Sequence, residues 1–532
     1  MHQDARYMDN DSVIDGDICI IGAGAAGISI ALEWDNLPYK VILLEGGGLE
    51  YDDRVQELFR GKTTGQRYYP LKSSRLHFFG GTTGHWGGLC SIFEPSAFEK
   101  RDWISESGWP FPATELGPYY QRAHKRLELG EYSFEVDHWI GKNASLTPLP
   151  LNKEVFYNKI WRYCVPEAMK FGKKFRDNII RSKNIQLFTY ANVVNLETSD
   201  NAQKITEATI RNYAGKTHRV RAKYFVLACC AIQNSRILLS STKQVTTGLG
   251  NENDLVGRYF MENIEIKSAE LWLKEPDALQ LYMRNAPNFK AELALTLQKQ
   301  QELKILNGML SFDPLDLARK IPPFIKSWTE EDPRENRKKM EKIYSNAGES
   351  RLSKMLHSNK HSSFEITMRL EQAPNSLSRI TLDDIEKDEL GMPRANLNWV
   401  FTSLEKKSAR TLYNLLGRQM GIAGIGRVKI EEILLDETNS TMPSTTSGGW
   451  HHMGTTRMSD DPKKGVVNSD GRLHNIYNLY VAGSSCFPNG AAVNPTFSIV
   501  ALSLRLSDQL KKTMQSETIL DVVKVPAKNN QR

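Results

Sequence analysis

Two adjacent histidines and an asparagine near the C-terminal end of the chain are suited by type to acid–base chemistry. His451 and His452 are neighbours, and Asn494 precedes a proline that opens a helical pattern. A neutral imidazole accepts a proton near neutrality, since its unperturbed pKa is about 6.5. A second polar group, such as the amide of Asn494, could hold the same substrate oxygen. In isolation, however, a satisfied core histidine and a plain helix cap explain His451 and Asn494 better.

Only one of the two histidines is expected to face such a site. Adjacent side chains of an extended segment point to opposite faces, so His452 either lines a substrate pocket or packs behind it. The same divergence argues against a metal at this pair, and no carboxylate or cysteine cluster accompanies it. The six cysteines form no CxxC pair, so neither a zinc site nor a disulfide framework is expected. No G-x-S-x-G elbow supports a serine hydrolase.

A glycine pattern near the N-terminus is typical of a dinucleotide-binding turn. GAGAAG at 22–27 follows the apolar run 18–21 and precedes a helical pattern that begins near Ala25. In such a turn the first glycine permits the tight bend, the second lets a pyrophosphate approach the backbone, and the third lets the helix pack closely. Glu45 ends the next apolar strand, where an acid would accept hydrogen bonds from ribose hydroxyls. The segment predicts an adenine dinucleotide on the helix N-terminus.

The hydrophobic pattern indicates the strands and helices that would hold these residues. Parallel-type strands are expected at 18–21, 40–45 and 478–483, and further strands at 186–196 and 219–228, the last followed by a turn and a helix. The glycine- and threonine-rich stretch 60–92 reads as a functional loop. A helix is expected within 109–130, antiparallel strands within 362–400, and helices at 403–421 and 494–511. The basic, proline-broken segment 315–360 reads as a helical insertion, either solvated or serving as a lid or docking surface.

Length and composition set the class of protein. With 532 residues the chain is too long for one ordinary core, so two domains are expected. Its 40% hydrophobic and 25% charged residues are typical of a globular protein, and the net charge of +7 is read as a solubility charge. No nucleic-acid module is present, so no nucleic-acid partner is expected. No signal peptide or transmembrane segment is recognised, so a cytoplasmic location is expected, with export by a partner subunit left open.

Long motifs in fixed order resemble the glucose–methanol–choline (GMC) oxidoreductase family. They cover nearly the whole chain: GAGAAG with Glu45, GGTTGHWGG at 80–88, VLACCAIQNSRILL at 226–239, GLGNENDLVGRYFMEN at 248–263, HHMGTTRM at 451–458 and NLYVAGSSCFPNGAAVNPTFSIVALSLRL at 478–506. The resemblance is closest in character to bacterial sugar and polyol dehydrogenases and to pyranose oxidases. It implies FAD as the cofactor.

The resemblance also implies the architecture. The fold class is α/β, with a discontinuous Rossmann-type FAD-binding domain and an α+β substrate domain built on an antiparallel sheet. The implied boundaries are 11–95, 186–264 and 446–516 for the FAD-binding domain, 96–185 and 265–445 for the substrate domain, and 517–532 for a tail.

Site residues follow from the same resemblance. His451 matches the catalytic base and Asn494 the residue paired with it, while His452 is a candidate for the substrate pocket. His85 matches a histidine that some members bond covalently to the flavin and others do not, so a covalent link stays open. The implied cofactor contacts are Gly22, Gly24, Ala25, Ala26, Gly27, Glu45, Gly81, Thr82, His85, Trp86, Gly88, Val193, Val194, Ala228, Gly483, Ser484, Pro495 and Thr496.

The activity implied is oxidation of a hydroxyl group on a sugar, glycoside or polyol. His451 would take the hydroxyl proton, and the hydride would pass to flavin N5. The electron acceptor is either O2 or another molecule, and a dehydrogenase is favoured over an oxidase. Two alternatives are an FAD-containing lyase of the same fold and a non-catalytic FAD-binding subunit of a larger complex. A small partner subunit is a further open expectation.

Overall fold

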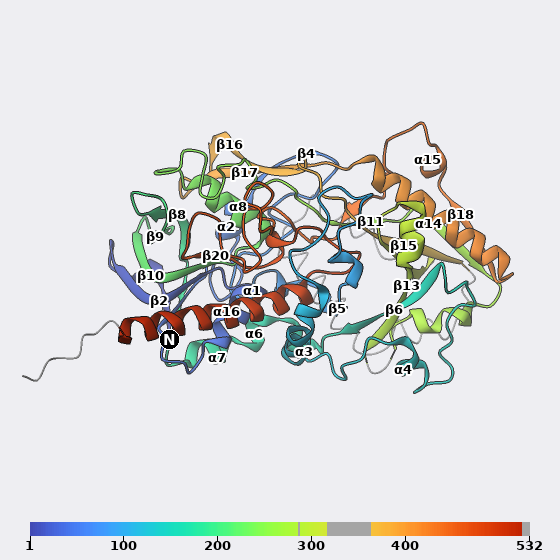
Figure 1. Cartoon of the computed structure of the whole chain (residues 1–532), viewed down its shortest axis with the longest axis horizontal. Helices are drawn as coiled ribbons and strands as arrows, with labels where there is room; N and C mark the ends of the chain where they lie inside the picture. Colours follow the sequence, from blue (N-terminus) through green and yellow to red (C-terminus); the bar gives the residue numbers. More distant parts are fainter. Residues whose placement is uncertain (286–287, 316–362, 524–532) are drawn as a thin grey trace, which may run out of the picture.

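The computed structural model describes residues 1–285, 288–315 and 363–523 of the chain (Figure 1). The helical insertion predicted near 315–360 lies, except for its first residue, outside the described residues. The molecule is elongated, with one β-sheet toward the left of Figure 1 and a second toward the right.

The first sheet is an eight-stranded, largely parallel sheet. Its strands are β1 (His2–Asp4), β2 (Val13–Ile21), β3 (Val41–Leu44), β7 (Ile185–Thr189), β8 (Asn192–Thr198), β9 (Ile205–Arg211), β10 (Thr217–Leu227) and β20 (Leu479–Val481). The order is β1-β7-β3-β2-β10-β9-β8, with β20 beside β10. Strands β1, β7, β3, β2, β10 and β20 pair in parallel, whereas β10, β9 and β8 pair antiparallel. The predicted return of the C-terminal strand to the N-terminal sheet is thus confirmed, since β20 pairs with β10.

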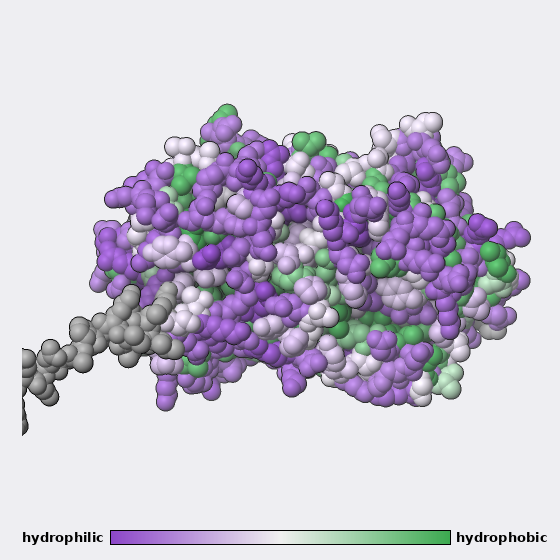
Figure 2. Space-filling model, in the orientation of Figure 1, coloured by the Kyte–Doolittle hydropathy of each residue, from purple (hydrophilic) through white to green (hydrophobic). Residues whose placement is uncertain are grey.

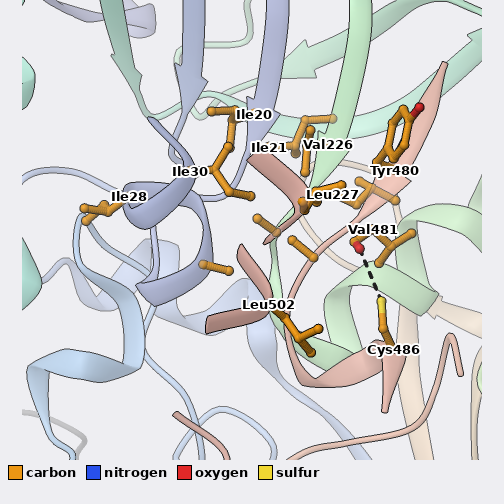
Figure 3. Close-up of a cluster of buried hydrophobic side chains, with 14 of the residues drawn as sticks. Ile20, Ile21, Ile28, Ile30, Val226, Leu227, Tyr480, Val481, Cys486 and Leu502 are labelled. Carbon is orange, nitrogen blue, oxygen red and sulfur yellow. Dashed lines mark hydrogen bonds between the residues drawn. The ribbon is translucent and has the colours of Figure 1, made fainter. Parts of the chain in front are cut away.

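Apolar side chains of the central strands pack against two helices that are far apart in the sequence (Figure 3). Helix α1 (Ala25–Glu33) follows β2, and α16 (Thr496–Val523) ends the described chain. The strands are apolar on both faces, as expected for parallel strands covered by helices. The labelled members of this cluster are Ile20, Ile21, Ile28, Ile30, Val226, Leu227, Tyr480, Val481, Cys486 and Leu502.

Helix α16 differs from the prediction at both ends. It begins at Thr496 rather than at 494, and it continues to Val523, so the segment predicted as a tail from 517 starts as helix. It runs on past the predicted end because extending an existing helix costs little, and no Gly or Pro interrupts the sequence between 511 and 523. The helix packs against α1 and against α3 (Gly117–Arg126). Arg122 of α3 supports this packing by an ion pair with Asp508 at 2.5 Å.

The second sheet has nine strands, and all of its pairings are antiparallel. The strands are β5 (Leu89–Cys90), β6 (Phe156–Tyr163), β11 (Asn263–Ile266), β12 (Ala269–Leu273), β13 (Phe289–Leu295), β14 (Gly308–Pro314), β15 (Ser363–Glu371), β18 (Gly426–Ile430) and β19 (Ser447–Gly448). Helix α14 (Ser403–Ile422), opened by a capping box between Thr402 and Glu405, packs on this sheet.

A small third sheet corrects the prediction for the segment 60–92 and contains two of the antiparallel strands predicted within 362–400. It joins β4 (Gly61–Gly65), β16 (Arg379–Lys387) and β17 (Pro393–Trp399). The segment 60–92 is therefore not wholly a loop, because its first residues pair in parallel with β17. The strands β16 and β17 belong to this sheet and not to the nine-stranded one. Strand pattern alone does not specify a partner, so the sequence could not separate the two sheets.

The remaining helices of the described residues are short. They are α2 (Asp53–Gln56), α4 (Val136–Ile140), α5 (Pro166–Met169), α6 (Phe171–Lys174), α7 (Arg176–Arg181), α8 (Cys230–Ser240), α9 (Leu297–Leu303) and α15 (Glu432–Leu435). Within the described ranges, no helix combines the length and the apolar character needed to cross a bilayer. Hydrophilic side chains cover most of the face seen in Figure 2.

Candidate active site

A cavity of about 1380 Å³ lies at the carboxyl ends of the central parallel strands. This volume includes space that is open to solvent. Residues at the ends of β2, β3 and β10 line it, together with Ala482 after β20 and the segment Trp450–His452. In open α/β sheets, ligands bind at this end of the strands because the loops there leave a crevice.

The turn between β2 and α1 shows why each position of the glycine pattern is glycine. Gly22 has φ +104, and a Cβ there would lie 2.7 Å from the carbonyl oxygen of Ala228. A Cβ on Gly27 would lie 1.8 Å from the carbonyl oxygen of Gly22, so this glycine lets α1 pack closely on the turn. Gly24, in contrast, lines the cavity, and a Cβ added there would have no atom within 4 Å. Gly24 therefore leaves room at the N-terminus of α1, where free N–H groups attract anions.

Glu45, the residue after β3, places a buried carboxyl group at the cavity. Its two oxygens accept hydrogen bonds from the backbone N–H groups of Gly47 at 2.9 Å and Ala23 at 3.2 Å. Burial raises the pKa of this carboxyl to about 7, although the backbone donors oppose the shift. The group is thus held beside the glycine turn as a hydrogen-bonding partner for a ligand.

Most of the residues predicted to contact a cofactor line this single cavity. They are Gly22, Gly24, Ala25, Ala26, Glu45, Gly81, Thr82, Trp86, Val193, Ala228, Gly483, Ser484, Pro495 and Thr496. Four predicted contacts are not among the lining residues: Gly27, His85, Gly88 and Val194. Val194 follows Val193 on β8, and successive strand residues point to opposite faces. Gly88 instead lies against the side chain of Met169, 2.9 Å from where its Cβ would be.

The histidine of the GGTTGHWGG motif packs behind the lining. The buried ring of His85 stacks on Trp450, with 5.2 Å between the ring centroids and 26° between the ring planes. Burial lowers the pKa of His85 to about 3, so its ring is neutral. Trp86 lines the cavity, and its indole N–H donates to the carbonyl oxygen of Met169 at 2.6 Å.

His451 and His452 both line the cavity, so His452 takes the first of its two predicted places, the lining of a pocket. The two histidines lie in a loop, and Trp450 just before them has φ +61. Within the part of the chain that is described, Nδ1 of His451 and Nε2 of His452 are buried without a hydrogen-bond partner. Burial, with a smaller effect from the Arg369 guanidinium, lowers the pKa of His451 to about 3. Burial also lowers the pKa of His452, so both rings are neutral.

Asn494 does not act as a simple helix cap. Its side-chain nitrogen donates to the carbonyl oxygen of Leu89 at 3.2 Å, two residues before α16 begins. Its side-chain oxygen is buried and accepts no hydrogen bond from the described residues. Asn494 is not among the lining residues, but Pro495 and Thr496 directly after it are. The amide oxygen is thus left available next to the cavity.

Two residues that were not among the sequence predictions complete the polar surroundings of the histidines. Glu262, which lies in the motif at 248–263, is fully buried and accepts the backbone N–H of His451 at 2.7 Å. The hydroxyl of Tyr68, from the glycine-rich segment, donates to the other oxygen of the same carboxyl. The motif was the only signal for Glu262, since its partners are 189 and 194 residues away in the sequence.

The buried histidines predict how stability depends on pH. The pKa values of His77, His85 and His451 are lowered to about 3, so between pH ~6.5 and ~3 the unfolded chain binds protons that the native protein does not. Each histidine then costs roughly 1 kcal/mol of unfolding free energy per pH unit as pH falls. Glu45 and Glu262 have pKa values raised to about 7 and 8, so the native protein binds protons that the unfolded chain does not. Between pH ~8 and ~4.5 these two carboxyls therefore increase the unfolding free energy as pH falls.

His124 and His452, whose pKa values burial also lowers, act in the same direction as His77, His85 and His451. We therefore expect urea titrations of the cofactor-free protein to show stability falling as pH drops below ~6.5, partly offset by the two carboxyls, and falling more steeply below pH ~4.5. A free energy of unfolding that rises steadily as pH falls from 7 to 4 would contradict the neutral, buried state of these histidines.

The structure is that of a mixed α/β protein with two large sheets. One cavity is lined both by the glycine turn and by the two neutral histidines. The family model described as GMC oxidoreductase matches residues 374–503. The chain is 24% identical to 6'''-hydroxyparomomycin C oxidase of Streptomyces lividus, over 92% of this chain and 90% of that protein. It is 24% identical to 2-methyl-1,2-propanediol dehydrogenase of Mycolicibacterium austroafricanum, over 93% of this chain and 95% of that protein.

Solved structures agree with this relationship at the level of the fold. A crystal structure of formate oxidase superposes with a TM-score of 0.57 and 15% identity, covering 96% of this chain and 100% of that one. These comparisons agree with the resemblance to GMC oxidoreductases that the ordered motifs indicated.

Proposed function

We propose that this protein is an FAD-dependent oxidoreductase that oxidises a hydroxyl group on a sugar, glycoside or polyol. The observation that supports this most is the single cavity that combines the open glycine turn at Gly24 with the two neutral histidines. The named relatives include an oxidase and a dehydrogenase whose names specify an aminoglycoside and a diol. The proposed FAD-binding domain comprises residues 11–95, 186–264 and 446–516, and the proposed substrate domain comprises 96–185 and 265–445.

The residues of the cavity fit FAD. Gly24 and Gly483 both line the cavity, and a Cβ added at either would have no atom within 4 Å, so the backbone is open to a pyrophosphate at both places. The Glu45 carboxyl is suited to accept hydrogen bonds from ribose hydroxyls. A further solved structure of the Aspergillus oryzae formate oxidase is described by the effect of a mutation on FAD modification, which supports FAD in this fold. Bound FAD would supply the hydride acceptor at N5 of its ring.

His451 is proposed as the base for the substrate hydroxyl. Its ring is neutral and its Nδ1 has no partner among the described residues, so this atom can take a proton. The unpartnered amide oxygen of Asn494 is proposed to hold the same substrate group and fix its orientation. His452 lines the same cavity and is proposed to contact the substrate.

An anaerobic screen tests the function. FAD-loaded protein is mixed with free sugars, glycosides and polyols, and flavin absorbance is followed. Bleaching by one class of hydroxyl compound is expected, and subsequent exposure to air separates the two acceptor types, because rapid reoxidation with peroxide identifies an oxidase. Turnover of a substrate without bleaching would instead favour the lyase alternative.

The attachment of the cofactor is tested at His85. The stacked position of this ring on Trp450 favours a supporting role, so we expect acid to release all FAD from the unmodified protein. His85→Ala should then lower the unfolding free energy by about 2–4 kcal/mol, as for other large-to-small core changes, and should leave acid release unchanged. Flavin that stays with acid-precipitated wild type but not with His85→Ala would establish a covalent link at His85.

A further inference from the structure

Glu262 is a buried carboxyl group that contacts both cavity histidines. It lies directly before β11 and is fully shielded from solvent. One oxygen accepts the backbone N–H of His451 at 2.7 Å. The other accepts the hydroxyl of Tyr68 and lies 3.7 Å from Nε2 of His452. One side chain thus faces the backbone of the proposed base and the ring of its neighbour.

Burying this carboxyl is energetically unfavourable. Within the described residues its ion-pair contact is with His452, and no Lys or Arg lies within 4 Å of its oxygens. Removing a carboxylate from water without a paired cation costs several kcal/mol, so the group tends to become neutral. Burial accordingly raises the pKa of Glu262 to about 8, against the opposing effect of the Tyr68 and His451 donors. The groups that face it are Tyr68, His451, His452 and Glu265, with Arg75 and Tyr69 beyond Tyr68.

We propose that Glu262 is the positioning residue of the two histidines, held in place by Tyr68. The proposal rests on the function proposed above and adds a residue to it. Glu262 fixes the backbone at His451 and thereby the direction from which its ring enters the cavity. When it is ionised, its negative charge 3.7 Å from Nε2 of His452 also favours the tautomer that carries hydrogen on that nitrogen.

The geometry makes Glu262→Gln an informative variant. A glutamine side chain has the same shape, and its amide oxygen can still accept the backbone N–H of His451. Its NH2 group, a donor, would then face Nε2 of His452. The tautomer with hydrogen on Nε2 becomes unfavourable, and the tautomer with hydrogen on Nδ1 is favoured. Tyr68→Phe leaves the carboxyl in place but removes the hydroxyl that holds it.

Two measurements test the proposal. In histidine-labelled, FAD-loaded protein above pH ~8, where Glu262 is ionised, the ¹⁵N shifts of His452, assigned with His452→Gln, should report Nε2–H in wild type and Nδ1–H in Glu262→Gln. The rate of flavin reduction by the best alcohol should fall on the order of tenfold in Glu262→Gln, about the value of one hydrogen bond, because the His452 ring then presents the other tautomer to the substrate. A limb of the wild-type rate profile near pH 8 should disappear in Glu262→Gln, and Tyr68→Phe should move it.

Glu405→Gln is the matched control. Glu405 is equally buried, but it caps α14 and does not line the cavity. This variant should lose stability and keep both the His452 tautomer and the rate profile. An unchanged tautomer and profile in Glu262→Gln would overturn the proposal. A wild-type protein that no alcohol reduces would instead overturn the proposed function, and the tautomer measurement would still test Glu262 by itself.

Discussion

His451→Ala is expected to lower the rate of flavin reduction by the alcohol substrate by about 10²–10⁴-fold, the usual contribution of a general base. The variant removes the Nδ1 atom that is buried without a partner in the described structure. FAD content should not change, because the glycine turn and Glu45 that are proposed to bind the cofactor are separate from this ring. Stopped-flow measurement under anaerobic conditions, with FAD quantified by absorbance, gives both quantities from one sample.

A matched substitution outside the cavity controls for loss of a histidine. His138 on α4 is partly exposed and pairs with Glu131 at 2.9 Å, so His138→Ala should leave the reduction rate unchanged. Chemical reduction by dithionite should proceed equally in all three proteins. If His451→Ala is reduced by the alcohol at the wild-type rate, His451 is not the base, and His452 becomes the next residue to test.

Gly24→Val is expected to abolish FAD binding while leaving the fold nearly intact. A Cβ added at this position would have no atom within 4 Å, so the new side chain meets open space in the cofactor-free protein. It would occupy the room at the N-terminus of α1 that a pyrophosphate needs. We expect FAD affinity to fall by at least about 100-fold, equivalent to about 3 kcal/mol. Fluorescence titration of apoprotein with FAD measures the affinity, and urea unfolding measures stability.

Substitutions at two other glycines serve as controls for the loss of FAD binding. Gly421 of α14 also has open space around an added Cβ but lies outside the cavity, so Gly421→Val should bind FAD normally. Gly27→Ala should destabilise the fold itself, because its Cβ would lie 1.8 Å from the carbonyl oxygen of Gly22. Normal FAD binding by Gly24→Val would show that the cofactor does not approach this turn.

Local patterns predicted most of the described elements. The apolar run before the glycine pattern became β2, the run at 40–45 became β3, and the segment after Ala228 became α8. These predictions succeed because a buried strand or helix must show its hydrophobic period in consecutive residues. The resemblance to the family was recognised on the same basis, from motifs in fixed order, and the comparisons agree with that resemblance.

Residue pattern was enough to establish that the glycine turn and the histidine segment exist and which chemistry suits each. Packing in three dimensions was needed to bring both to one cavity and to separate β16 and β17 into a sheet with β4. It also brought both histidines to the lining of that cavity. Glu262 and Tyr68 come to lie beside His451 and His452 through the same packing. Contacts between residues nearly 200 positions apart depend on how sheets and loops pack, and no local period encodes them.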